Sequence, residues 1–149
     1  MNHAPKLKTF LWYPSDLDKV LTFYKETFPD FVMESRTHLS DGQTFIAEFS
    51  IYGHQLVAMC TPRGEPFNTS ISLSLTVDGQ EEVDRLWNAI TEKGAEGRCG
   101  WCTDEFGVSW QIVPSQMHQY LASSDLAVAT YANKALMKMN KIVVEDLHE

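Results

Sequence analysis

The stretch at residues 99–114, CGWCTDEFGVSWQIVP, predicts two short strands joined by a four-residue turn. We expect the strands at residues 98–103 and 108–113. An aspartate and a glycine bound the turn, because aspartate can hydrogen-bond its own backbone and glycine accepts a positive φ. Along the second strand, large apolar residues alternate with Ser109 and Gln111. This alternation predicts a half-buried strand whose amide side chain needs polar surroundings.

Residues 9–114, which include this hairpin, have two halves of similar order. A loop at residues 61–69 that is rich in proline and glycine separates them. The first half predicts a strand, an amphipathic helix and three strands. The second predicts a strand, a helix and the hairpin, with a further short strand near Glu96. Gly94 follows the helix, where we expect the left-handed glycine of a helix C-terminus. The predicted bounds are residues 9–13, 17–28, 31–38, 44–52, 55–60, 71–77 and 80–93.

Composition restricts the class of protein. With 149 residues, 44% of them hydrophobic, the chain can form one domain with its own core. Its net charge of −8 argues against nucleic acid or an anionic membrane as a partner, since both attract basic surfaces. We expect a cytoplasmic protein without a membrane partner, because the sequence shows neither a long apolar run nor a leader pattern. Three cysteines, an odd number, do not make a disulfide framework.

After Pro114 the sequence changes to a helical tail, with helices predicted at residues 116–122 and 127–139. The second helix has an apolar stripe that must be buried, either against its own domain or against a second subunit. Both arrangements are left open by the sequence. The stripe consists of Val128, Tyr131, Ala132, Ala135, Leu136 and Met139.

Several motifs together resemble one known family. They are FY at 23–24, GHQLVAM at 53–59, FN at 67–68, QEEVD at 80–84 and the hairpin sequence itself, with a further likeness at 137–142. The chain resembles the PhnB-like family, often described as 3-demethylubiquinone-9 3-methyltransferase-like. That family lies within the glyoxalase/bleomycin-resistance, or vicinal oxygen chelate (VOC), superfamily. The resemblance covers nearly the whole chain.

The resemblance implies an α+β fold of paired βαβββ modules whose strands form an open half-barrel, with the helices outside and a ligand on the concave face. The modules would span residues 9–60 and 71–114 within a VOC domain at 1–114, followed by the helical tail at 115–149. A homodimer is also implied.

The concave face has candidate ligand-binding residues. The strands at 71–77 and 108–113 each place a polar set opposite an apolar set, and we expect the polar set to line the concave face. A solvated outer face would explain the serines equally well, but it explains an amide between two bulky apolar neighbours less well. Two tryptophans could also line this face and would favour a flat, partly apolar ligand. The predicted ligand-binding residues are Ser72, Ser74, Ser109, Gln111, Trp12 and Trp101.

Glu48 is the candidate general base, because a carboxylate buried on the concave face would have a raised pKa. On an outer face it would be an ordinary surface carboxylate. The pair Cys99 and Cys102 has C-x-x-C spacing, but on a predicted strand residues three apart face opposite sides, which disfavours a redox dithiol. The five histidines, including His3, show no pair at ligand spacing.

We expect no metal and no cofactor. In metal-dependent VOC proteins, His, Glu or Gln side chains enter the concave face from the first and fourth strands of the leading module and from their counterparts. Carried over by motif, these positions are Thr9 or Phe10, Ala58, Ser72 and Gln111. Only Gln111 is a plausible ligand there, and one amide does not hold a divalent ion. Glu48 is the residue that could substitute.

Two function classes remain open. One is a binding protein with a metal-free small-molecule site, and the other is a metal-dependent isomerase, lyase or dioxygenase of the glyoxalase superfamily. Neutral polar residues rather than acid–base pairs favour the first. Methyl transfer is disfavoured, because Tyr13-Pro14-Ser15-Asp16 stands where a nucleotide-type cofactor fold needs a glycine-rich turn. The identity of the ligand and any reaction stay open.

Overall fold

The computed structural model describes residues 6–149, so His3 lies outside the described residues. The chain forms two compact units, the first ending at Glu65 and the second beginning at Pro66. This boundary falls within the loop at residues 61–69. Each unit is described by itself.

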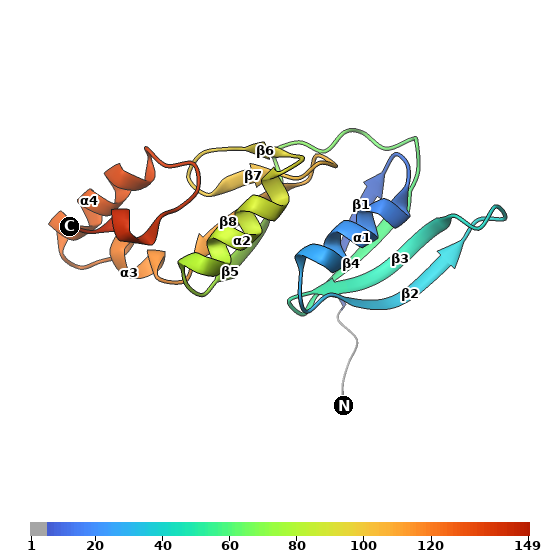
Figure 1. Cartoon of the computed structure of the whole chain (residues 1–149), viewed down its shortest axis with the longest axis horizontal. Coiled ribbons are helices and arrows are strands. Elements are labelled where there is room, and N and C mark those ends of the chain that lie inside the picture. Colours follow the sequence, from blue (N-terminus) through green and yellow to red (C-terminus); the bar gives the residue numbers. More distant parts are fainter. Residues whose placement is uncertain (1–5) are drawn as a thin grey trace, which may run out of the picture. The chain divides into compact units, whose positions relative to one another are not determined.

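The first module is a four-stranded sheet with one helix lying across it (Figure 1). The strand order is β1-β4-β3-β2, with β1 parallel to β4 and the other pairs antiparallel. Asp16 caps the helix by accepting a hydrogen bond from the Lys19 backbone at 3.2 Å. The elements are β1 (Thr9–Tyr13), α1 (Leu17–Thr27), β2 (Val32–His38), β3 (Thr44–Ile51) and β4 (His54–Cys60).

The second module repeats this plan, with strand order β5-β8-β7-β6 and β5 parallel to β8 (Figure 1). The predicted α+β fold of paired βαβββ modules with a C-terminal helical tail is confirmed. The elements are β5 (Leu73–Val77), α2 (Gln80–Thr91), β6 (Ala95–Glu96), β7 (Trp101–Thr103) and β8 (Ser109–Pro114). The tail consists of α3 (Met117–Leu121), α4 (Leu126–Leu136) and the 3₁₀ helix η1 (Val144–Leu147).

In each module the helix covers one face of the sheet, and the core lies between them. In the first, the Tyr24 hydroxyl is hydrogen-bonded to that of Tyr13, and its ring lies 5.6 Å from that of Phe49. In the second, Trp87 and Trp110 are almost fully buried, as their positions on the apolar stripes predicted. Burying such rings contributes roughly 2–3 kcal/mol each to stability.

The predicted strand at 98–103 is wrong at its start, since β7 begins only at Trp101. Cys99 and Gly100 both have positive φ, at 56° and 85°, and form a turn. Both backbone N–H groups donate to carbonyls of the tail. The Cys99 N–H donates to Met139 at 2.9 Å, and the Gly100 N–H donates to Asn140 at 2.8 Å. The turn therefore forms because it pairs with a segment 40 residues later, a partner that local sequence patterns do not reveal.

Gly94 also differs from its prediction, because its φ is not among the positive ones and it is not a left-handed cap. A Cβ atom there would lie 1.9 Å from the carbonyl oxygen of Thr103. The glycine is required by the close approach of the β7 backbone to the end of α2, not by its own conformation.

The segment after α4 docks on its own module, whereas Val128 and Tyr131 of the predicted apolar stripe are exposed. Gln80 on α2 donates from Nε2 to the Ile142 carbonyl at 2.9 Å and accepts from the Val144 N–H at 2.8 Å. Lys141 forms an ion pair with Asp84 at 2.8 Å, and its ammonium, with Gln80, holds the pKa of that carboxyl below its usual value. Ile142 and Leu147 are fully buried. Among residues 6–149, no helix is long and apolar enough to cross a membrane.

Candidate functional site

Each module has a sheet face that its own helix does not cover, which we call its open face. In the first module, the open face follows from the register, because paired residues point to the same side of a sheet. Glu48 is paired with Val57, and Trp12 with Met59, whereas Phe49 faces α1. Along β1, β3 and β4, the open face of the first module consists of Phe10, Trp12, Ile46, Glu48, Ser50, Gln55, Val57 and Met59.

The candidate base Glu48 thus lies on an open face, as its hypothesis requires. Its carboxylate forms an ion pair with Lys8 at 2.6 Å, and the two side chains are 36% and 33% exposed. A partly exposed carboxylate neutralised by a lysine differs from the desolvated carboxylate of a typical general base. The role of Glu48 as a base stays a prediction.

Trp12 is 46% exposed, so its indole presents a large apolar surface on this face. Gly64, in the loop after β4, packs against it: a Cβ atom at Gly64 would lie 3.2 Å from the Trp12 Cβ and 3.3 Å from its ring. The loop is tied to the strand by the Thr61 N–H, which donates to the Tyr13 carbonyl at 2.7 Å. The loop therefore fixes the orientation of the indole.

The motif-based position Ala58 was assigned to the wrong face. Ala58 is paired with Leu11 and Ala47, is fully buried, and lies on the side covered by α1. The open-face positions of β4 directly before and after Ala58 are Val57 and Met59. Because strand side chains alternate, a one-residue error in register exchanges the two faces. Neither Val57 nor Met59 offers a nitrogen or oxygen ligand.

The open face of the second module brings together five of the six predicted ligand-binding residues. Gln111 donates from Nε2 to the Ser72 hydroxyl at 3.0 Å, which supplies the polar partner that we expected the amide to need. Ser109 donates to the Asn68 carbonyl at 3.5 Å. Register places Ser74 and Trp101 on either side of Gln111. The open face of the second module consists of Ser72, Ser74, Thr76, Trp101, Thr103, Ser109, Gln111 and Val113.

Asp104 is a buried carboxylate whose full role the sequence did not reveal. It accepts the backbone N–H groups of Phe106 and Val108 at 2.9 and 3.0 Å, which is the expected turn chemistry. It also accepts the Trp110 indole N–H at 2.9 Å, a bond that joins the turn to the core. Burial raises the pKa of Asp104 to about 6, although these three donors favour the charged form. The carboxylate stabilises the hairpin rather than facing an open face.

The cysteines do not form a reactive pair. Burial, with the nearby carboxylates of Asp104 and Glu96, raises the pKa of the Cys102 thiol to about 12. Cys99 points to the tail, where its thiol donates to the Leu136 carbonyl at 3.5 Å. A nucleophilic cysteine needs a lowered pKa and access to solvent, so this setting is that of structural thiols.

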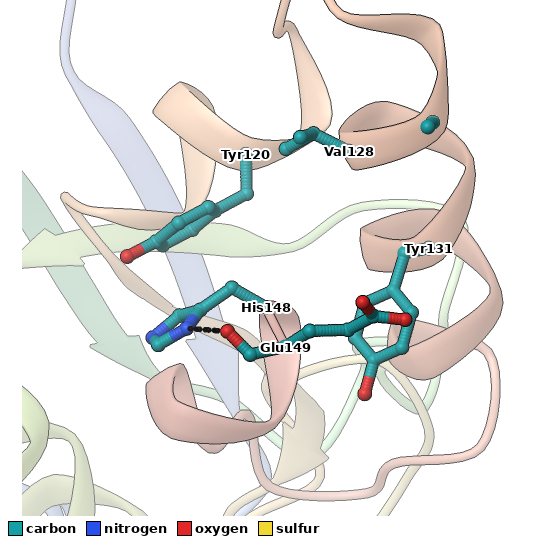
Figure 2. A pocket seen from close by; sticks show the side chains of 6 residues that line it. Tyr120, Val128, Tyr131, His148 and Glu149 are labelled. Atoms are coloured by element: carbon teal, nitrogen blue, oxygen red, sulfur yellow. Dashed lines mark hydrogen bonds between the residues drawn. The ribbon is translucent and has the colours of Figure 1, made fainter.

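Two pockets lie away from the predicted residues. One, of about 540 Å³, lies between α1 and β2 and is lined by Leu21, Thr22, Lys25, Phe31, Met33 and Arg36. The other lies in the tail and is shown in Figure 2. Within the described part of the chain, no three His, Cys, Asp or Glu side chains are grouped so that they could hold a metal ion.

Paired βαβββ modules in one chain define the fold of the vicinal oxygen chelate superfamily. The model of the family described as 3-demethylubiquinone-9 3-methyltransferase matches residues 5–113. The chain therefore belongs to this PhnB-like family. Comparison with curated proteins gave no match.

Solved structures share the fold. The PhnB protein from Bacillus cereus is 22% identical with a TM-score of 0.67, and the match covers 74% of this chain and 100% of that one. Protein PA1353 from Pseudomonas aeruginosa is 20% identical with a TM-score of 0.61, covering 74% and 98%. The fosfomycin resistance protein FosX from Listeria monocytogenes, solved with Mn(II) and sulfate, is 14% identical with a TM-score of 0.56, covering 80% and 98%. At these identities the likeness concerns the fold alone.

Proposed function

We propose that this protein binds a small molecule on the open faces of its sheets, without a metal, as a PhnB-like VOC protein. One observation carries the proposal: the open face of the second module gathers neutral hydroxyl groups around the Gln111 amide, with Trp101 on the neighbouring strand. The Gln111–Ser72 hydrogen bond at 3.0 Å holds the amide in a fixed orientation. Oriented neutral polar groups beside an aromatic ring are typical of small-molecule sites. The ligand would be a flat, oxygenated and partly apolar molecule.

The open face of the first module is proposed as a candidate surface of its own, with Glu48 and Trp12 as its ligand contacts. The indole offers an apolar surface, and the Lys8–Glu48 pair offers one charge of each sign. If the protein is an enzyme, Glu48 is the residue we assign as its base, which requires Lys8 to release it. Methyl transfer has no support in this fold, since neither module is a doubly wound nucleotide-binding sheet.

A thermal-shift screen of metabolites tests the proposal, because a ligand that binds only the folded state raises the melting temperature. We expect the Gln111→Ala variant to lose the shift given by any true ligand. The matched control is Gln119→Ala, which removes an amide from the exposed surface of α3. Equal shifts in wild type and both variants would reject the site.

A metal-dependent enzyme is the second candidate, and the observation that favours it is the fold shared with FosX, which was solved with Mn(II). Elemental analysis of untagged protein purified without chelator distinguishes the two. We expect well under one Zn, Ni, Fe or Mn per chain. A stoichiometric metal that disappears in Gln111→Ala or Glu48→Ala would establish the metal-dependent class instead.

The family resemblance supports a homodimer, and Leu126 and Met137, at the two ends of α4, are exposed apolar residues that suit such an interface. Light scattering at micromolar concentration should give twice the mass of the chain, and a monomer would reject this part. We also propose a cytoplasmic location, which suits three free thiols.

A further inference from the structure

The pocket in the helical tail is a second candidate binding site, separate from the open faces. Its volume is about 380 Å³, within the range of small-molecule sites. All six lining residues belong to α3, α4 and the two residues after η1, whereas the family match ends at residue 113. The pocket is therefore a feature of this chain's tail. It is lined by Tyr120, Ala127, Val128, Tyr131, His148 and Glu149.

Three of the six lining residues carry an aromatic ring. The rings of Tyr120 and His148 stack, with centroids 5.0 Å apart and planes inclined by 25° (Figure 2). The His148 Nδ1 lies 3.3 Å from the main-chain oxygen of Glu149, which helps to hold the imidazole in place. Tyr131 and Val128 face the pocket from α4 and are 39% and 36% exposed. A ligand with methyl or methylene groups would cover this surface and remove it from water.

The charge of the lining has one sign. Glu149 contributes a carboxylate, and the described lining contains no lysine or arginine. The protein as a whole has a formal net charge of −8, which attracts cations and repels anions. Electron-rich phenol faces with a carboxylate are the groups that recognise an ammonium ion through cation–π and Coulomb attraction. A neutral apolar ligand would use the rings but gain nothing from the carboxylate.

We propose that this pocket binds a small organic cation, an alkylammonium whose carbon groups contact Tyr120, Tyr131 and Val128 and whose charge faces Glu149. The site needs no residue of the open faces, so it does not depend on the proposed function. Binding is expected to be weak, because the pocket is open to solvent and a cation–π contact at an exposed site contributes little.

Choline and its neutral isostere 3,3-dimethylbutan-1-ol provide the test, since they differ only in the charged nitrogen. Titrations of the full chain would follow the tyrosine ring signals by NMR, with sodium chloride keeping the ionic strength constant. Choline should shift the Tyr120 and Tyr131 signals saturably and bind about tenfold more tightly than the alcohol. Equal affinity for the two compounds, or no shift of these rings, would overturn the proposal.

Two variants separate the contribution of the aromatic ring to choline affinity from the contribution of the carboxylate charge. Tyr131→Leu keeps apolar bulk but removes a π face, so the preference for choline should fall. Glu149→Gln should weaken choline and leave the alcohol unchanged. The matched control is Glu145→Gln, which makes the same charge change on η1 outside the lining. If Glu145→Gln weakens choline as much as Glu149→Gln, net charge rather than the pocket is responsible, and the proposal fails.

Discussion

The two modules share one architecture but differ in their open faces. On the side covered by the helix, both carry large buried rings, with Phe49 and Tyr24 in the first and Trp87 and Trp110 in the second. On the open side, the first module has the exposed rings of Phe10 and Trp12, three less exposed aliphatic side chains, the polar Ser50 and Gln55, and the Lys8–Glu48 ion pair. The second has hydroxyl groups, an amide and one tryptophan. The fold is thus repeated while the surface chemistry is not.

This difference separates two roles. The helix-covered faces are alike because both must fill a core at close-packed density, and any large apolar side chain of the right volume serves. The open faces have no such requirement, so their residues are free to differ. We therefore attribute stability to the covered faces, and our proposal places ligand binding on the open ones.

The largest expected effect distinguishes two tryptophans of the second module. Trp110→Ala should reduce the free energy of unfolding by roughly 3–5 kcal/mol, because it leaves a cavity and removes the indole donor from one oxygen of the buried Asp104 carboxylate. Trp101→Ala, on the open face, should cost about 1 kcal/mol or less. Urea unfolding with fluorescence detection measures both. Similar costs for the two variants would remove the distinction between the faces.

The second effect depends on pH and on Asp104. Its folded-state pKa of about 6 lies above the ordinary value of 3.8, so the folded state binds the proton more tightly than the unfolded state. The stability that this group contributes is therefore present at low pH and is lost as pH rises through 6. The advantage of wild type over Asp104→Asn should grow by about 1 kcal/mol between pH 7 and pH 5.

The difference in stability between wild type and Asp104→Asn cancels the pH dependence that the other carboxylates contribute to both proteins. Thr44, with Arg36 and His38, lowers the pKa of Asp18, and that group acts in the opposite direction in both proteins. Equilibrium unfolding at pH 5, 6 and 7 gives the difference directly. An advantage that shrinks toward pH 5 would show that the three donors, not burial, determine the titration of Asp104.

A smaller effect tests how the first module orients its indole. In Gly64→Ala, the new Cβ would lie 3.2 Å from the Trp12 Cβ, so the side chain must move by a few tenths of an ångström. We expect a stability cost below about 1 kcal/mol and a shift of the Trp12 indole N–H signal in the NMR spectrum. The Trp101 signal is the internal control. An unchanged Trp12 signal would contradict the contact.

The smallest effect concerns the ion pair. A double-mutant cycle with Lys8→Met and Glu48→Gln should give a coupling below about 1 kcal/mol, since both side chains are about one-third exposed. The coupling should fall further at high salt. A salt-independent coupling above about 2 kcal/mol would show a desolvated pair, and would place more chemistry on the first module than we assign to it.

Much of this fold could be predicted from local patterns. The helix stripes, the alternating strands and the proline- and glycine-rich loop determine two βαβββ modules, because hydrophobic period and turn residues are local properties. The grouping of Ser72, Ser74, Ser109 and Gln111 followed from the same alternation.

Most of what the sequence did not predict concerns contacts between separate elements, and one error concerns strand register. Cys99 forms a turn because its N–H meets the Met139 carbonyl, and Gly94 is required by the Thr103 carbonyl. Neither carbonyl carries a sequence signal. The Asp104–Trp110 bond likewise joins a turn to a core ring, which spacing does not indicate. The position carried over from the family motif, Ala58, is one residue away from an open-face position. Because side chains alternate along a strand, an error of one residue exchanges the two faces.

The most direct test of the central claim is to locate a bound ligand. A compound that raises the melting temperature in the metabolite screen would be titrated into isotopically labelled protein, with NMR shifts mapped to residues. We predict the largest shifts at the Gln111 side-chain amide, the Trp101 indole and the backbone of Ser72 and Ser74. For a compound that is not an organic cation, shifts confined to the helices α1 and α2, or to the tail, would contradict the assignment of ligand binding to the open faces.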